Sequence, residues 1–203
     1  MRLTGMVIGL TATLLATPLF ATEASKASVA EDKAEALEEK VVEDAAPPKP
    51  REKLTTGEVR AVDPAGQSPM DDSITCLART IYWEAKGADD KDMSAVASVV
   101  LNRLGHDGFP DTLCGVVKQG VETRACQFSW WCDGRPDQVE EPQRYDIAKE
   151  IARKALNQQL KDSTGGALYF HDRQVHPDWA RAYRKTAETR HFIFYKPNQA
   201  LAR

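Results

Sequence analysis

The sequence predicts an α+β domain over residues 72–203, mostly helical with a small antiparallel β-sheet. Apolar residues recur at helical spacing in three long segments, and two short strand-like segments lie near the C-terminus. All four tryptophans, all five tyrosines and all four cysteines lie in this part of the chain. Its roughly 130 residues are enough for one compact core.

The first helix is predicted over residues 73–86. Ile74, Leu77 and Ile81 recur at helical spacing and form one apolar stripe along it. Gly87 follows directly, and glycine is a natural helix stop. The stripe is therefore expected to face the core of the domain.

The second helix is predicted over residues 91–104, with Asp89 or Asp90 as its cap. It is apolar on nearly every side, so we expect it to be buried at the centre of the domain. A glycine- and proline-containing turn follows, and then a short helix over residues 113–119.

The last part of the chain predicts one long helix and two strands. Residues 120–142 are irregular, and the third long helix spans residues 143–160. Residues 167–171 and 191–195 are short strand candidates, the second strongly aromatic. We expect them to pair as a small antiparallel sheet.

The first 21 residues predict a secretory signal peptide, with an apolar run over residues 6–15 and cleavage after Ala21. An uncleaved anchor is the alternative, but the run is too short to span a bilayer comfortably. We therefore expect an exported protein of the periplasm or cell envelope, without stable membrane insertion after cleavage.

Residues 22–71 predict a disordered linker, because they are rich in Ala, Glu, Lys and Pro and poor in large apolar residues. A fragile helix over residues 31–44 would end at the prolines that follow it. The segment carries 7 basic and 12 acidic residues, whereas residues 72–203 carry 19 and 18. The folded part is thus nearly neutral, which argues against a nucleic-acid partner.

The four cysteines favour two disulfides, since an exported protein meets an oxidising compartment. Three pairings are possible. We favour Cys76 with Cys114 and Cys126 with Cys132, although sequence alone does not fix the choice. A zinc site is the rival interpretation, but no Cys-x-x-Cys or His-Glu-x-x-His motif occurs. We expect neither a metal nor a cofactor.

Glu84 is the strongest catalytic candidate. It lies on the flank of the apolar stripe and at the end of the first helix. A carboxyl group at such a border is expected to have a raised pKa, which a general acid needs near neutral pH. An ordinary glutamate on a helix rim is the alternative. Trp83 points away from the stripe, where either a sugar ring or a second element would cover it.

The segment 126–132 is the densest chemical cluster of the chain. It sets Gln127, Ser129 and Trp130 among further aromatic residues between two cysteines. If those cysteines pair, the loop is a rigid polar and aromatic platform that suits an acetylated sugar; a purely structural loop is the alternative. His171 is a candidate for orienting or binding.

Taken in order, these segments resemble the SleB/CwlJ-type cell wall hydrolase family, named for spore cortex-lytic enzymes. The resemblance covers about residues 74–196. Each block is weak alone, but their order and spacing make a strong match. The blocks are Cys76–Arg79, Ile81–Gly87, Ala95–Arg103, Phe109–Pro110, Cys114–Val117, Gln127–Ser129, Gly166–His171, His176–Trp179 and His191–Tyr195.

The resemblance implies a lysozyme-like fold and cleavage of peptidoglycan glycan strands between N-acetylmuramic acid and N-acetylglucosamine. It also implies lytic transglycosylase chemistry that leaves a 1,6-anhydro end, with Glu84 as the catalytic acid and base. Supporting roles toward the substrate fall by motif position on Gln127, Ser129, Tyr169, Trp130 and His171.

One departure from the family pattern leaves the reaction type open. Many relatives carry an acid directly after the signature glycine, where this chain has Ala88 followed by Asp89 and Asp90, so hydrolysis with a second carboxylate competes with transglycosylation. A non-catalytic peptidoglycan-binding or envelope scaffold protein, and a peptidoglycan amidase, are the alternative functions. Protein partners are not predicted.

Overall fold

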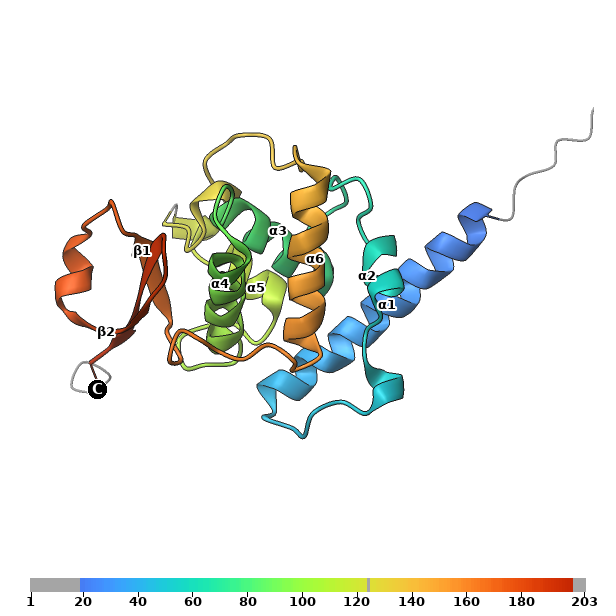
Figure 1. Cartoon of the computed structure of the whole chain (residues 1–203), viewed down its shortest axis with the longest axis horizontal. Coiled ribbons are helices and arrows are strands. Elements are labelled where there is room, and N and C mark those ends of the chain that lie inside the picture. Colours follow the sequence, from blue (N-terminus) through green and yellow to red (C-terminus); the bar gives the residue numbers. More distant parts are fainter. Residues whose placement is uncertain (1–18, 124, 199–203) are drawn as a thin grey trace, which may run out of the picture.

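The computed structural model describes residues 19–123 and 125–198. These residues form a helical body with a small sheet at one end (Figure 1), and the α+β prediction is confirmed. The helices are α1 (Leu19–Val42), α2 (Thr56–Ala61), α3 (Ser73–Glu84), α4 (Asp90–Arg103), α5 (Leu113–Lys118) and α6 (Pro142–Leu156). The strands are β1 (Tyr169–Asp172), β2 (Tyr183–Glu188) and β3 (Phe192–Pro197). Short 3-10 turns are η1 (Pro50–Glu52), η2 (Val121–Thr123), η3 (Ser129–Trp131) and η4 (Asp178–Arg181).

Helices α3 and α4 form the centre of the helical body. Every residue of α3 from Ile74 to Tyr82 is buried, and α3 packs against α1, α4, α5 and α6. Helix α4 is buried on nearly every side, as its apolar sequence predicts. Asp72 and Asp89 cap the two helices by accepting backbone N–H bonds of their first turns. Both central helices therefore begin at a side-chain cap that fixes their ends.

Helix α6 ends four residues before the predicted boundary. Gln158 has a left-handed backbone with φ of 54°, which stops the helix. The side chain of Asn157 is turned to Leu54, accepting from its backbone N–H at 2.8 Å and donating to its carbonyl at 2.9 Å. A contact distant in sequence thus decides where this helix ends.

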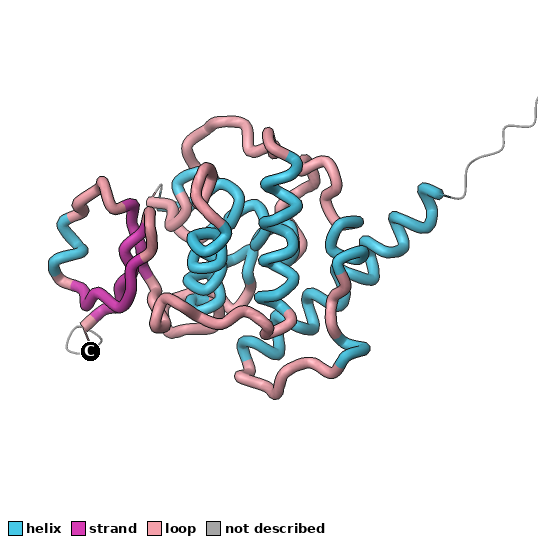
Figure 2. Tube along the Cα trace, viewed as in Figure 1, coloured by secondary structure: helices cyan, strands magenta, loops and turns pink. Residues whose placement is uncertain are grey.

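The sheet has the order β1-β3-β2, and both pairs are antiparallel. The two predicted strands correspond to β1 and β3, but β2 was missed. This strand pairs only with β3 and its sequence, Tyr-Arg-Lys-Thr-Ala-Glu, is largely polar and exposed, so no hydrophobic alternation marks it. Figure 2 shows the three strands beside the helical body.

The sheet is joined to α4 by side chains at two places. Buried Asp92, near the start of α4, lies 2.6 Å from Nδ1 of His191, which precedes β3. Arg103, the last residue of α4, donates from Nε to the carbonyl of Leu168 at 2.7 Å, just before β1. Phe192 and Phe194 on one face of the sheet belong to the hydrophobic core.

The prediction that residues 22–71 are a disordered linker is contradicted by the structure. This segment contains α1, η1 and α2, and Ala30, Ala34 and Leu37 on one face of α1 are buried in the common core. Composition indicates only that α1 is weak in isolation, whereas the body supplies the apolar surface that stabilises it. Two alanines and a leucine at i, i+4 and i+7 form a sufficient apolar stripe once a partner surface exists.

Residues 62–70 also belong to the folded body. Asp63 is buried and accepts hydrogen bonds from Arg79 on α3 and from Tyr145 on α6. Its backbone adopts a left-handed φ of 44°, and its Oδ1 accepts from the backbone N–H groups of Gln67 and Ser68. The segment therefore carries a buried charge that the helical core requires.

Most of the predicted signal peptide, residues 1–18, lies outside the described residues. Helix α1 runs continuously through residue 21, where cleavage is predicted. None of the helices within residues 19–123 and 125–198 combines the length and apolarity needed to cross a membrane.

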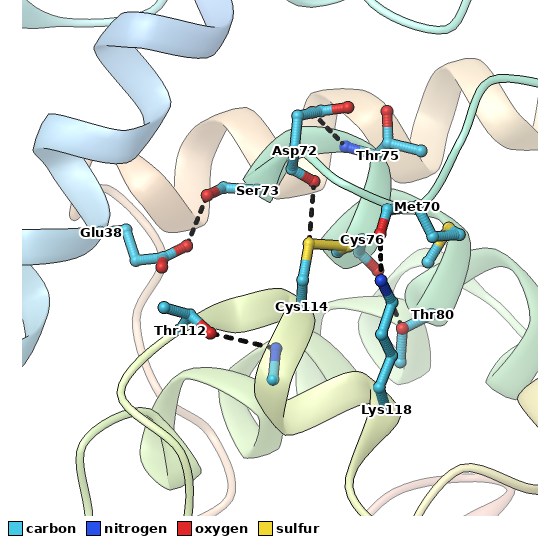
Figure 3. Close-up of a disulfide and its surroundings, with 11 residues drawn as sticks. Glu38, Met70, Asp72, Ser73, Thr75, Cys76, Thr80, Thr112, Cys114 and Lys118 are labelled. Carbon is cyan, nitrogen blue, oxygen red and sulfur yellow. Dashed lines mark hydrogen bonds between the residues drawn. A yellow bond between two sulfur atoms is a disulfide. The ribbon is translucent and has the colours of Figure 1, made fainter. Parts of the chain in front are cut away.

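Both preferred disulfides are present, Cys76–Cys114 and Cys126–Cys132. Figure 3 shows the first pair, which joins α3 to α5. Nearby, Ser73 donates to Glu38 of α1 at 2.5 Å, and Lys118 donates to the Met70 carbonyl. This disulfide thus lies where α1, α3 and α5 meet.

Candidate active site

Glu84 is the last residue of α3, at the end of a helix whose inner face is wholly buried. Its side chain is half-buried, and burial raises the pKa of its carboxyl from 4.5 to about 7. The nearby positive charge of Arg103 acts in the opposite direction and limits this rise in pKa. The carboxyl group therefore exists in both protonation states near neutral pH.

Arg103 is a buried cation at the end of α4. Its guanidinium carbon lies 4.9 Å from the ring centre of Phe128, 5.3 Å from Phe109 and 5.6 Å from Tyr169. Its Nε donates a hydrogen bond to the Leu168 carbonyl, whereas one terminal nitrogen, Nη1, has no hydrogen-bond partner among the described residues. Burial lowers the pKa of this guanidinium to about 10, so it stays charged at neutral pH.

Tyr169, at the start of β1, connects Arg103 to the outer face of the sheet. Its ring lies 4.9 Å from that of Tyr183 on β2 and 6.1 Å from that of Phe109. Burial, followed by the influence of Tyr183, raises the pKa of the Tyr169 hydroxyl, while Arg103 opposes the rise. Tyr169 is thus a neutral hydrogen-bonding group beside the buried guanidinium.

His171 lies two residues farther along β1, on the same face of the sheet. Its ring stacks on Tyr195, and Nε2 is 3.1 Å from the Tyr195 hydroxyl. Nδ1 lies 2.8 Å from the carbonyl oxygen of Asp172. Trp179 from η4 packs its ring against His171, Tyr195 and Tyr183. The outer face of the sheet therefore carries a continuous, half-buried aromatic cluster.

The disulfide-closed loop alternates between buried and exposed residues. Phe128 is fully buried against Arg103, whereas its neighbours Gln127 and Ser129 are exposed. Trp130 is only 7% exposed, and its Nε1 has no hydrogen-bond partner among the described residues. The loop thus exposes the amide of Gln127 and the hydroxyl of Ser129 to solvent, while Trp130 is buried beneath the surface of the loop.

The comparisons with known proteins follow this arrangement. The sequence profile of a family described as cell wall hydrolase matches residues 87–195, more than half of the chain. The chain belongs to the cell wall hydrolase family. Helix α3, which ends at Glu84, lies just before the matched residues. The candidate acid is therefore not part of the matched range.

Two spore cortex-lytic enzymes are among the relatives of this chain. The enzyme of Halalkalibacterium halodurans is 36% identical over 109 residues, covering 53% of this chain and 28% of that protein. The enzyme of Oceanobacillus iheyensis is 39% identical over 107 residues, covering 53% and 34%. The match therefore spans about a third of the length of these relatives.

A solved structure is also similar. It is the catalytic domain of the germination-specific lytic transglycosylase SleB from Bacillus anthracis, with 29% identity and a TM-score of 0.50. The similarity covers 64% of this chain and 98% of that domain. The described part of the chain thus contains the fold of a nearly complete SleB catalytic domain.

The predicted site residues fall into three groups. The charge of Arg103 lowers the pKa values of both Glu84 and Tyr169, and the guanidinium carbon lies 5.6 Å from the Tyr169 ring centre. Ser129 and Trp130 share a pocket with the residues that flank Glu84. His171 lies in the aromatic cluster of the sheet, and Gln127 is an exposed residue of the loop.

Sequence reasoning missed Arg103, Phe128, Trp179 and Tyr183 as contributors to the site. Arg103 had a usable signal, because a cation on a helix that is apolar on nearly every side must be buried or paired. Trp179 ends one of the family blocks, but no local pattern places it beside Tyr183, since η4 and β2 bring the two rings together only in the folded chain.

Trp83 is half-buried. Its Nε1 donates to the Asp137 carbonyl at 3.2 Å, and the Lys86 ammonium lies 4.6 Å from its ring centre. A second element therefore covers this tryptophan in part. Across the described part of the chain, no group of three or more His, Cys, Asp or Glu side chains is arranged to hold a metal ion.

Proposed function

We propose that this protein cleaves peptidoglycan glycan strands between N-acetylmuramic acid and N-acetylglucosamine as a lytic transglycosylase, with Glu84 as its general acid and base. The observation that carries the proposal is the half-buried Glu84 carboxyl, whose pKa burial raises to about 7. A general acid that later acts as a base works best when its pKa lies near the operating pH.

In the first step, protonated Glu84 donates its proton to the glycosidic oxygen as the bond to the muramic acid carbon breaks. The leaving strand departs with a free hydroxyl group, and Glu84 becomes a carboxylate. That carboxylate then takes the proton of the muramic acid 6-hydroxyl, whose oxygen attacks the cationic carbon. The product has a 1,6-anhydro end, and Glu84 is protonated again.

Arg103 supports this cycle as a positioning residue. Its charge favours the carboxylate form of Glu84, the form that exists between the two proton transfers. Three aromatic rings and the Leu168 carbonyl hold the guanidinium in place. A fixed charge that stabilises the intermediate state needs no rearrangement during the reaction.

Two neighbouring acids are already engaged elsewhere, which favours transglycosylation over hydrolysis. Asp89 caps α4 by accepting from the backbone N–H groups of Lys91 and Asp92 at 3.0 and 2.9 Å. Asp90 accepts from Arg144 at 3.3 Å. Hydrolysis by the two-carboxylate route needs a second acid facing the cleft, and these contacts direct both candidates to the N-terminus of α4.

The remaining predicted residues are proposed to bind the sugar. The exposed amide of Gln127 and hydroxyl of Ser129 suit the N-acetyl group, and Tyr169 suits a hydrogen bond beside Glu84. His171 orients the aromatic face of the sheet, and Trp130 supports the opposite wall. We further propose that the protein acts after export, in the periplasm or cell envelope.

The test is to digest purified peptidoglycan with the full chain and with Glu84→Gln, and to identify the soluble products by mass spectrometry. The full chain is needed because residues 22–71 pack into the core. Products with 1,6-anhydro ends from the wild type alone would support the proposal. Reducing ends would point to a hydrolase, and equal activity of the variant would remove Glu84 from the mechanism.

A further inference from the structure

A pocket of about 500 Å³ opens next to the C-terminal turn of α3, which carries Glu84. It lies between the end of α3 and the chain that follows the disulfide-closed loop, and its lining includes Trp83, Lys86 and Trp130. Consecutive α-carbons are about 3.8 Å apart, so Trp83 brings the rim of this pocket next to the catalytic candidate. Anything attached to a sugar bound at Glu84 therefore has this pocket within reach.

The pocket carries charges of both signs. Lys86 and Arg135 contribute the cations, and Asp133, Asp137 and Glu140 contribute the carboxylates. The hydroxyl and acetamido groups of a bare glycan chain are uncharged, so they offer no ionic partner to these five groups. This mixture complements a ligand that carries both ammonium and carboxylate groups.

The two cations differ in how firmly they are paired. Lys86 forms a short ion pair with Glu140 and lies over the Trp83 ring, so it is held in place. The Arg135 side chain is 84% exposed, and its Nε is 3.9 Å from Asp133, too far for a strong hydrogen bond. Arg135 is therefore the cation that is available to an incoming carboxylate.

The buried wall of the pocket has an unused donor. Trp130 is more than nine-tenths buried, and its Nε1 has no acceptor among the described residues. A buried donor without a partner is costly, and such groups commonly mark a position where a ligand or water completes the bond. A carbonyl group entering beside Trp130, with a small shift of the indole, would supply the acceptor.

We propose that this pocket binds the peptide stem that N-acetylmuramic acid carries on its lactyl group. The inference rests on the proposed function, because it is the muramic acid sugar that is attacked at Glu84. That sugar bears its lactyl peptide about one ring width from the 6-hydroxyl. The stem is a short peptide whose free carboxylate groups can pair with Arg135 and whose ammonium group can pair with a carboxylate of the pocket. The protein therefore selects glycan strands that still carry stems.

The kinetic test compares two forms of one substrate: purified glycan strands with stems, and the same strands after an amidase has removed them. For the full chain, kcat/KM is expected to be at least tenfold higher on the stem-bearing strands. Arg135→Glu is expected to reduce this ratio to below threefold. Arg184→Glu makes the same charge change at an exposed position of β2, outside the pocket, and is expected to keep the ratio of the wild type.

A binding test gives a readout independent of catalysis. A soluble muramoyl tripeptide is titrated onto Glu84→Gln while tryptophan fluorescence is followed, with muramic acid lacking the peptide as control. A saturable change with the peptide alone would support the inference, and so would its weakening by at least fivefold when Arg135→Glu is added.

Equal cleavage of both substrates by the wild type would overturn the inference and leave glycan cleavage intact. The same holds if Arg135→Glu keeps the full preference for stems, or if both titrants give the same fluorescence change. Absence of cleavage on both substrates would overturn the proposed function, and the inference with it.

Discussion

Arg79 on α3 donates from Nε to Asp63 at 2.9 Å, and both side chains are buried. The Tyr145 hydroxyl donates to the same carboxylate at 2.8 Å, so three segments of the chain meet at this carboxylate. These contacts hold the pKa of Asp63 below its ordinary value, although burial alone would raise it. Helix α3, which carries Glu84, thus depends on a residue that precedes the predicted domain boundary.

Removing one partner of this ion pair should destabilise the protein strongly. Asp63→Ala leaves the guanidinium of Arg79 buried and uncompensated, and such losses typically cost about 3–5 kcal/mol. Urea denaturation of the full chain would measure the change in the free energy of unfolding. The double variant Asp63→Ala with Arg79→Met is the control and should recover much of the loss. A loss of less than 1 kcal/mol for Asp63→Ala would contradict this account.

Activity should decline above neutral pH. Glu84 must be protonated to begin the cycle, and its pKa is about 7, so the reactive form is lost as the pH rises through that value. The measurement is kcat/KM on soluble glycan strands between pH 5 and 9, at constant ionic strength. A steady decline of kcat/KM from pH 5 upward, as the ordinary glutamate pKa of 4.5 would give, would show that burial does not tune this group.

The same pKa predicts a stability difference between the wild type and Glu84→Gln. Between pH 4.5 and 7 the folded wild type binds a proton at Glu84 that the unfolded chain has released, so its stability falls as the pH rises. Glutamine does not titrate. At about 1.4 kcal/mol per pKa unit, the variant should gain up to about 3 kcal/mol relative to the wild type between pH 5 and 8. Denaturation curves at both pH values would reveal a constant difference if Glu84 is not the responsible group.

Replacing Arg103 should change the pH profile as well as the rate. Arg103→Met removes the charge that opposes the rise of the Glu84 pKa, so the alkaline limb is expected to move to higher pH while the maximal rate falls. Arg103→Lys keeps a positive charge and should leave the limb closer to that of the wild type. A lower rate with an unmoved limb in both variants would assign Arg103 a purely structural role.

Much of the fold follows from local patterns. The apolar stripe of Ile74, Leu77 and Ile81 predicts α3, and the dense apolar run of α4 predicts its central burial. The position of Glu84 beside that stripe likewise marks it as a catalytic candidate, which stays a prediction. In each case the deciding information lies within one or two turns of a helix.

The features that were missed depend on contacts distant in sequence. Helix α1 is stable only because the body covers Ala30, Ala34 and Leu37, and β2 is a strand only because β3 pairs with it. The contact of Arg103 with Tyr169 likewise joins two residues that no local pattern connects. Such contacts leave no local periodicity, so composition alone suggested a linker in place of α1 and no strand was predicted at β2.

The sheet is attached to α4 through Asp92 and Arg103, which lie eleven residues apart on one helix. At 1.5 Å per residue the two attachment points are about 16 Å apart along a rigid axis. Because the sheet is held at two separated points of α4, it cannot rotate freely about either contact. The distance between the aromatic face of the sheet and the end of α3 is therefore fixed before a glycan strand binds. Little binding energy is then spent on bringing the sheet and α3 together.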